Sequence, residues 1–289
     1  MGNLIKAEFR KVLTTKLWWA LLIPTVLLAL GWSLATGAIG TELTNALESS
    51  EARTLQRALG VNSDEWLVSV FGMARSINIA MLFPLIFGGL AISNEVSRKT
   101  ITTTFLTAPT RVAALTAKMI NYVVWGAIYG VAIVATVSLG IVITSDSDRL
   151  PAAGGWLGLA GVGILMSILM TLFGIGIGAL IRSVPGTVVT LLLYFLLLEN
   201  ALQLGLAGQL PEIGGFLPNG SANGMTGSVA TDIFLGAAGV VPDEIEFTVR
   251  SIAGALGAFD WWLSGLIFLG WTLVAFGGGW WSTQQRDVT

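Results

Sequence analysis

"WLGLAGVGILMSILMTLFGIGIGALI", residues 156–181, is a run of 26 residues without a charged side chain. A helix needs about 20 mostly apolar residues to cross the roughly 30 Å hydrocarbon core of a membrane, so this stretch can span it. The whole 289-residue chain shares this character, because only 11% of its residues are charged and its mean hydropathy is +0.79. A soluble domain has about a quarter charged residues. The composition therefore predicts a membrane protein.

Six stretches meet this length requirement, and tryptophans such as Trp18, Trp156 and Trp261 stand at their ends, as is typical of the membrane surface. They predict an all-α polytopic protein with a single transmembrane domain over residues 17–289. The first span follows a basic start, as a signal peptide does, but its apolar core exceeds about 15 residues, so we expect an uncleaved span. The predicted spans are residues 17–39, 76–93, 119–143, 156–181, 186–206 and 261–281.

The distribution of charge predicts the orientation, because cytoplasmic segments carry an excess of Lys and Arg. With both termini and the loop 94–118 on one side, ten of the fifteen cations fall on that side. Fourteen of the seventeen carboxylates fall on or near the other side. The sequence thus predicts cytoplasmic termini, with extracellular regions at residues 40–75 and 207–260.

Residues 1–16 are predicted to form an amphipathic helix in the inner headgroup layer, with Ile5, Phe9, Val12 and Leu13 on one face. The alternative is a plain polar extension of the first span. On the outer side, we expect residues 40–75 to form a partly helical cap.

The longer outer region, 207–260, is rich in Gly and Pro at first and then contains two apolar pieces, 229–241 and 247–259. Each piece is too short to cross a membrane, which predicts extracellular re-entrant or interfacial helices. An added pair of short spans is the alternative, although charges at a helix centre are costly.

Pairs of glycines spaced four residues apart occur in or near three spans. Small residues at this spacing let helices approach closely, and we expect them to pack helices of this chain rather than to form a dimer seam. The pairs are Gly126 with Gly130, Gly154 with Gly158, and Gly174 with Gly178.

The chain contains no cysteine and no histidine, which excludes disulfides, Cys/His metal sites and catalysis by imidazole. None of its five lysines follows a glycine, so it lacks the phosphate-binding G-x-x-x-x-G-K-[ST] loop. We therefore expect no enzyme activity and no cofactor in this chain itself. If the protein uses ATP and Mg, another chain must bind them.

Glu199 is the one carboxylate inside a predicted span. Ionisable groups within a membrane are functional candidates by default. Together with Asn78 in the second span and the nearby Asn200 and Gln203, Glu199 forms our set of candidate transport-path residues. The alternative is that the fifth helix ends early, so that Glu199 faces outer water or caps a re-entrant helix.

The loop 94–118 is polar and rich in threonine, unlike the apolar runs on either side. Residues 95–107 are predicted to form a short helix across the membrane surface, which Pro109 ends. A short surface helix with a carboxylate and neighbouring cations suits docking into another protein.

This loop resembles the signature of ABC-2 type transporter permeases, in which a Glu is followed by Gly-Thr and then by Leu, Pro, Arg and Lys. The six-span layout, the amphipathic start and the re-entrant material before the sixth span are also similar to that family. Lys99 departs from the pattern, because the family usually has Gly before the Thr. The residues that carry the resemblance are Glu95, Thr100, Phe105, Leu106, Thr107, Pro109, Arg111 and Lys118.

The resemblance implies a type V, ABC-2 exporter-like fold in a bacterial cell membrane and export of a drug, an antibiotic peptide or a lipid. It implies that two permeases, as a homodimer or a heterodimer, associate with two ABC ATPase subunits and with membrane lipid, and not with nucleic acid. The loop 94–118 would be the coupling helix that the ATPase grips. Its coupling residues would be Glu95, Arg98, Lys99, Thr100, Pro109 and Arg111.

Three alternatives remain open from the residues alone. Arg98 and Lys99 would serve as no more than a topology signal if positive charge is their only role. The protein would be an ATP-independent secondary transporter or channel if Glu199 and Asn200 carried an ion or a proton. It would be a non-transporting scaffold if its role were to assemble a partner.

Overall fold

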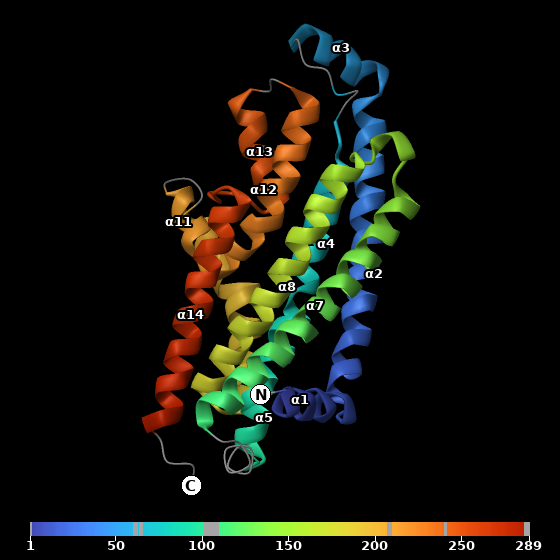
Figure 1. Ribbon diagram of the computed structural model, residues 1–289. Coiled ribbons are helices and arrows are strands. Elements are labelled where there is room, and N and C mark those ends of the chain that lie inside the picture. Colours follow the sequence, from blue (N-terminus) through green and yellow to red (C-terminus); the bar gives the residue numbers. More distant parts are fainter. Residues whose placement is uncertain are drawn as a thin grey trace.

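The computed structural model describes residues 2–59, 63, 66–100, 110–206, 210–239 and 242–285, and this part of the chain is helical, with no strand. Six helical segments are long and apolar enough to cross a membrane, and Figure 1 shows them as one elongated bundle. The predicted multi-pass helical protein is confirmed. The segments are α2 (Leu17–Leu47), α4 and α5 (Ser69–Ala80 and Leu82–Ser97), α7 (Arg111–Thr144), α8 (Ala153–Ile181), α9 with η2 and α10 (Val184–Leu192, Leu193–Leu198 and Glu199–Leu206), and α14 (Trp261–Gln285).

The second segment is longer than predicted and is broken at Met81, between α4 and α5. Pro84 explains the break, because proline offers no N–H to the carbonyl of Ala80 and its ring crowds that carbonyl. Before the break, the Met81 N–H is shared between the carbonyl oxygens of Ile77 at 3.2 Å and Asn78 at 3.3 Å, as is common at a helix end. Residues 69–75, which we expected in the outer cap, therefore belong to this segment.

The fifth segment contains a π-helical stretch, η2, between α9 and α10. Wider helical turns of this kind are rare and occur frequently at functional sites. Here the Asn200 Nδ2 donates to the carbonyl oxygens of Phe195 at 3.0 Å and Leu196 at 2.9 Å, both within η2. A side chain thus satisfies carbonyl groups that the irregular turn leaves exposed.

Helix α8 lies at the centre of the bundle and packs against α5, α7 and α14. A Cβ added at Gly174 would lie 2.1 Å from the Leu85 carbonyl oxygen, and one at Gly178 would lie 2.0 Å from that of Gly89. The pairs Gly126 with Gly130 and Gly174 with Gly178 thus pack helices of this chain, as predicted, whereas among the described residues Gly154 with Gly158 does not. At Gly158, an added Cβ would meet nothing within 4 Å, so that glycine packs against no described neighbour.

The region before the last span contains α11 (Pro211–Phe216), α12 (Pro218–Ala238) and α13 (Asp243–Ala253). Helix α12 begins at Pro218, eleven residues before the predicted apolar piece, and it packs against α4, α8, α13 and α14. In Figure 1, α12 rises from the middle of the bundle and α13 descends beside it. The Gly- and Pro-rich stretch therefore begins a long buried helix rather than a loop.

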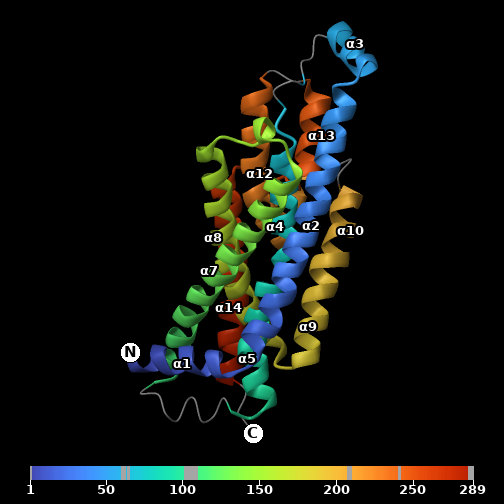
Figure 2. The same ribbon diagram turned by 90° about the vertical axis from the view of Figure 1, so that its right-hand side faces the viewer.

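Helix α1 (Gly2–Thr14) runs across the lower end of the bundle, below α2, as Figure 2 shows. Val12 is buried, and the Phe9 ring stacks on Trp125 of α7 with 5.6 Å between ring centroids. Leu13, predicted on the same face, is 45% exposed, whereas Glu8 is 8% exposed. The inward face of α1 is therefore partly ionic, which its hydrophobic pattern did not indicate.

Candidate functional site

A cavity of about 320 Å³ lies where α2, α4, α5, the fifth segment and α12 meet. Its apolar lining includes Trp32, Ile79, Leu82 and Leu196. Met81, at the break between α4 and α5, is one of the lining residues. Six polar side chains line the cavity as well, namely Thr36, Arg75, Asn78, Asn200, Asn219 and Asn223.

The four candidate transport-path residues lie close together, but only Asn78 and Asn200 line this cavity. The Asn78 Oδ1 accepts a hydrogen bond from the Thr226 Oγ1 at 2.5 Å. The Asn78 Nδ2 is buried and has no hydrogen-bond partner among the described residues. A buried donor without a partner costs free energy, so this amide is available to donate a hydrogen bond to a molecule in the cavity.

Glu199 is fully buried and faces the start of α12 rather than the cavity. Its carboxylate accepts hydrogen bonds from the backbone N–H groups of Asn219 at 2.8 Å and Gly220 at 2.6 Å. Gln203 adds a third bond from its Nε2, at 3.1 Å. The first N–H groups of a helix lack partners within it and carry partial positive charge, so the carboxylate caps α12. Capping of a helix was one of the alternatives that the sequence left open.

Arg75 was missed by the sequence reasoning because it fell outside the predicted second span. It is exposed at the cavity wall, and its Nε donates to the Ile252 carbonyl oxygen at 2.7 Å and its Nη2 to that of Ser251 at 3.2 Å. These carbonyls belong to the last turn of α13, the negative end of the helix dipole. Arg75 thereby connects α4 to the C-terminal end of α13, the second helix of the α12–α13 hairpin.

Asn219 and Asn223 were also missed, because their stretch was read as an outer loop. Asn219 donates from its Nδ2 to the Phe195 carbonyl oxygen at 3.3 Å, and Asn223 donates to the Asn219 Oδ1 at 3.2 Å. The sequence signal that could have placed them is Pro218, since proline is favoured in the first turn of a helix.

A second cluster of interest lies at the other end of α5, where four charged side chains from three helices meet. The Lys118 Nζ of α7 donates to the Glu8 Oε2 of α1 at 2.8 Å and to the Glu95 Oε1 of α5 at 2.6 Å. Lys11 of α1 also donates to the Glu95 Oε1. Lys118, Glu95 and Glu8 are only 4%, 6% and 8% exposed. We call this set the buried charge cluster.

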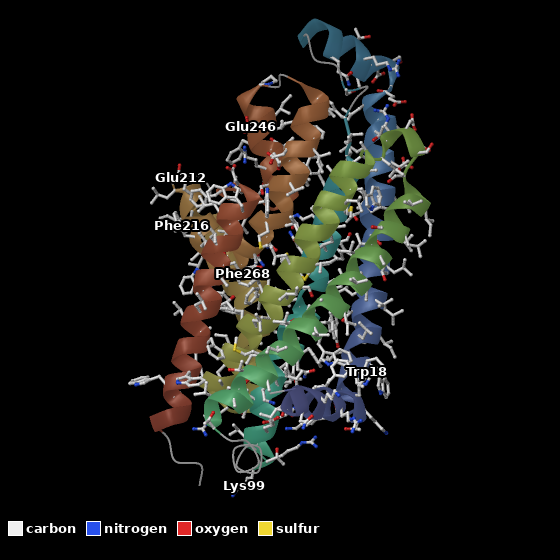
Figure 3. The ribbon with its side chains drawn as sticks, viewed as in Figure 1. Trp18, Lys99, Glu212, Phe216, Glu246 and Phe268 are labelled. Carbon is white, nitrogen blue, oxygen red and sulfur yellow. The ribbon has the colours of Figure 1, made fainter. Side chains whose placement is uncertain are left out.

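Glu95 is therefore in the last turn of α5 and turned inward, not at the start of a separate surface helix. The predicted helix over residues 95–107 is wrong at its beginning, because α5 ends at Ser97. The remainder, residues 101–109 with Pro109, lies outside the described residues, and so does the side chain of Arg111. Arg98, Lys99 and Thr100 are exposed beyond the end of α5, and Figure 3 shows Lys99 at the tip of the structure.

Lys99 occupies the position at which the resembling family has glycine, and its backbone is left-handed, with φ of 55°. The Thr100 N–H donates to the Glu95 carbonyl oxygen at 2.9 Å and the Lys99 N–H to that of Val96 at 3.1 Å. This pair of bonds is the Schellman motif, which ends a helix and favours glycine at the left-handed residue. Lysine thus keeps the turn that glycine would form, at some cost in strain.

Helix α5 connects the buried charge cluster to the cavity. Glu95 stands at one end, and Leu82 and Leu85, about 20 and 15 Å further along at 1.5 Å per residue, line the cavity. A displacement of the turn at Lys99 along the helix axis would therefore move the cavity wall.

Comparison with protein-family models gives no match for this chain, and no curated protein matches it.

Proposed function

We propose that this chain is the permease subunit of an ABC-2 type exporter. It would move a hydrophobic or amphipathic substrate out of a bacterial cell while a separate ABC ATPase binds ATP and Mg. Two such permeases, identical or paralogous, would form the membrane part. The observation that carries the proposal is α5, which joins a charged, firmly held end to the wall of a polar cavity within the bundle.

The buried charge cluster suits the end of the permease that would contact the ATPase. Removing one partner of a buried ion pair leaves an uncompensated charge, so α1, α5 and α7 are expected to move as one unit. The exposed Arg98 and Lys99 follow directly on α5 and would offer positive charge to the ATPase. Force applied to this turn would reach all three helices.

The α12–α13 hairpin suits an extracellular re-entrant element. The carboxylate that caps α12 stands about 22 Å along the fifth segment from its start at Val184, at 1.5 Å per residue. The helix would thus begin within the outer part of the membrane and leave on the far side from α1. Cytoplasmic termini and a type V fold fit this arrangement.

The ATP-independent carrier built on Glu199 has less support. A carrier must release and rebind its proton or ion, whereas three hydrogen bonds hold this carboxylate at the start of a helix. Flux in liposomes that needs no ATP and is abolished by Glu199→Gln would favour the carrier over the exporter.

The exporter proposal is tested by asking whether an ABC ATPase subunit co-purifies with the protein from its native membranes. The double variant Arg98→Glu with Lys99→Glu should lose ATPase binding, because it reverses charge at the exposed turn without touching the buried charge cluster. Arg53→Glu, on α3 (Ser50–Leu59) at the opposite end, is the matched control and should bind as the unmodified protein does. The proposal fails if no ATPase binds, or if the double variant binds it unchanged.

A further inference from the structure

Among the described residues, Arg75 is the only ionised side chain that lines the 320 Å³ cavity. It stands 22 residues before the end of α5, about 30 Å away at 1.5 Å per residue, so it lies far from the buried charge cluster. The segment around it is apolar enough to cross a membrane. An arginine in such a segment is costly and marks a functional site by default.

The charge of Arg75 has no carboxylate partner among the described residues. Its two hydrogen bonds go to carbonyl oxygens of Ser251 and Ile252, which supply at most the partial charge of a helix end. Glu199 is not a lining residue and is already held by the start of α12. The cavity therefore carries an excess of positive charge that no described carboxylate neutralises.

The groups around Arg75 add hydrogen-bonding capacity. The Asn78 Nδ2 is buried and has no partner in the part of the chain that the structure describes, and Asn223 of α12 lines the same cavity. Guanidinium and amide N–H groups together suit the oxygens of a phosphate, sulfate or carboxylate group.

The cavity wall also contains apolar side chains. Trp32 of α2, Leu82 of α5 and Leu196 of η2 line the cavity together with these polar groups. A molecule that filled the space would thus meet a cation, amides and hydrocarbon side chains.

We propose that this cavity binds the anionic head group of an amphiphile, with Arg75 as its counter-charge and the hydrocarbon part against Trp32, Leu82 and Leu196. This names the substrate class of the exporter and rests on the proposed function for the transport step only. Binding itself needs no ATPase. A bilayer phospholipid and an exported single-chain amphiphile share this chemistry.

The test measures quenching of Trp32 by brominated amphiphiles in nanodiscs of phosphatidylcholine, with Trp32→Phe as the reference for the other tryptophans. The probes are bromododecyl phosphate, bromododecyl trimethylammonium and bromododecyl maltoside. The phosphate probe should bind about tenfold or more tightly than the cationic probe, the size expected for hydrogen bonds to a charged group. Nanodiscs that also contain phosphatidylglycerol separate the two sources, because a phospholipid ligand would compete with the probe and an exported amphiphile would not be displaced.

Three variants show which residues determine the preference for the phosphate probe over the cationic probe. Arg75→Gln, which can still donate to α13, should abolish it, and Arg75→Lys should retain most of it. Asn223→Asp adds a carboxylate to the cavity without touching α13 and should also abolish the preference, because it neutralises the charge of Arg75. This variant also decides the matter if Arg75→Gln fails to fold.

Equal binding of the phosphate and cationic probes by the unmodified protein would overturn the inference. An undiminished preference in either Arg75→Gln or Asn223→Asp would also do so. A preserved charge preference in a protein that binds no ATPase would refute the exporter while leaving the anionic site intact.

Discussion

Replacement of Lys118 by methionine should destabilise the protein by about 3 kcal/mol, because it leaves two carboxylates buried beside each other. Lys118 donates to Glu8 at 2.8 Å and to Glu95 at 2.6 Å, and these residues are only 8% and 6% exposed. Removal of one partner from a buried ion pair costs about 3–5 kcal/mol. We expect the lower end of that range, because Lys11 still donates to Glu95 and lies 3.8 Å from Glu8.

The measurement is the free energy of unfolding in detergent micelles, followed by tryptophan fluorescence. The matched control is the triple variant Lys118→Met with Glu8→Gln and Glu95→Gln, which removes the stranded charges together with the lysine. Replacement of a whole buried ion cluster by uncharged groups is often close to neutral, so most of the lost stability should return. A loss below about 1 kcal/mol in the single variant, or a triple variant as unstable as the single one, would refute this account of the cluster.

Three further predictions concern the backbone. Lys99→Gly should raise the free energy of unfolding by about 1 kcal/mol, since glycine adopts a φ of 55° without strain, and Lys99→Ala should give no such gain. Glu199→Ala should lower it by about 2 kcal/mol by leaving two helix N–H groups buried without an acceptor, and an unchanged melting temperature would contradict the capping role. Gly174→Ala should destabilise by about 2 kcal/mol, because its Cβ would lie 2.1 Å from the Leu85 carbonyl oxygen, whereas Gly158→Ala, the open-space control, should not destabilise. Equal unfolding midpoints for the two alanine variants would show that the α5–α8 contact is looser than described.

The spans themselves could be predicted because each depends on a local property, a long apolar run. The span over residues 156–181 illustrates this, since α8 ends at Ile181 as predicted. The second span was predicted to begin too late, at residue 76, because a charged residue such as Arg75 is expected to lie in water when only its neighbours in sequence are considered. Its actual partners, the carbonyls of Ser251 and Ile252, lie 176 and 177 residues away in the chain.

The candidate site was harder to predict than the spans for the same reason. The spacing around Glu95 indicated an exposed docking residue. In the structure, Lys118, 23 positions later, and the N-terminal helix α1 bury it. The burial of Glu8 was not predicted, because a hydrophobic pattern cannot register a buried ionic partner 110 residues away. The π-helical turn at η2 has no established sequence signal, so its carbonyls and their bond to Asn200 were not expected.

Two of the bonds that hold the α12–α13 hairpin differ greatly in the length of chain that they enclose. Glu199 and Asn219 are 20 residues apart, so the cap on α12 can form as soon as the fifth segment has been inserted during synthesis. The bond from Arg75 to Ile252 encloses 177 residues and must wait until α13 has been made. Contacts of long sequence separation form late because closure of the chain opposes them. The start of α12 can thus be fixed to the fifth segment first, and Arg75 gains its partners in α13 only later in translation.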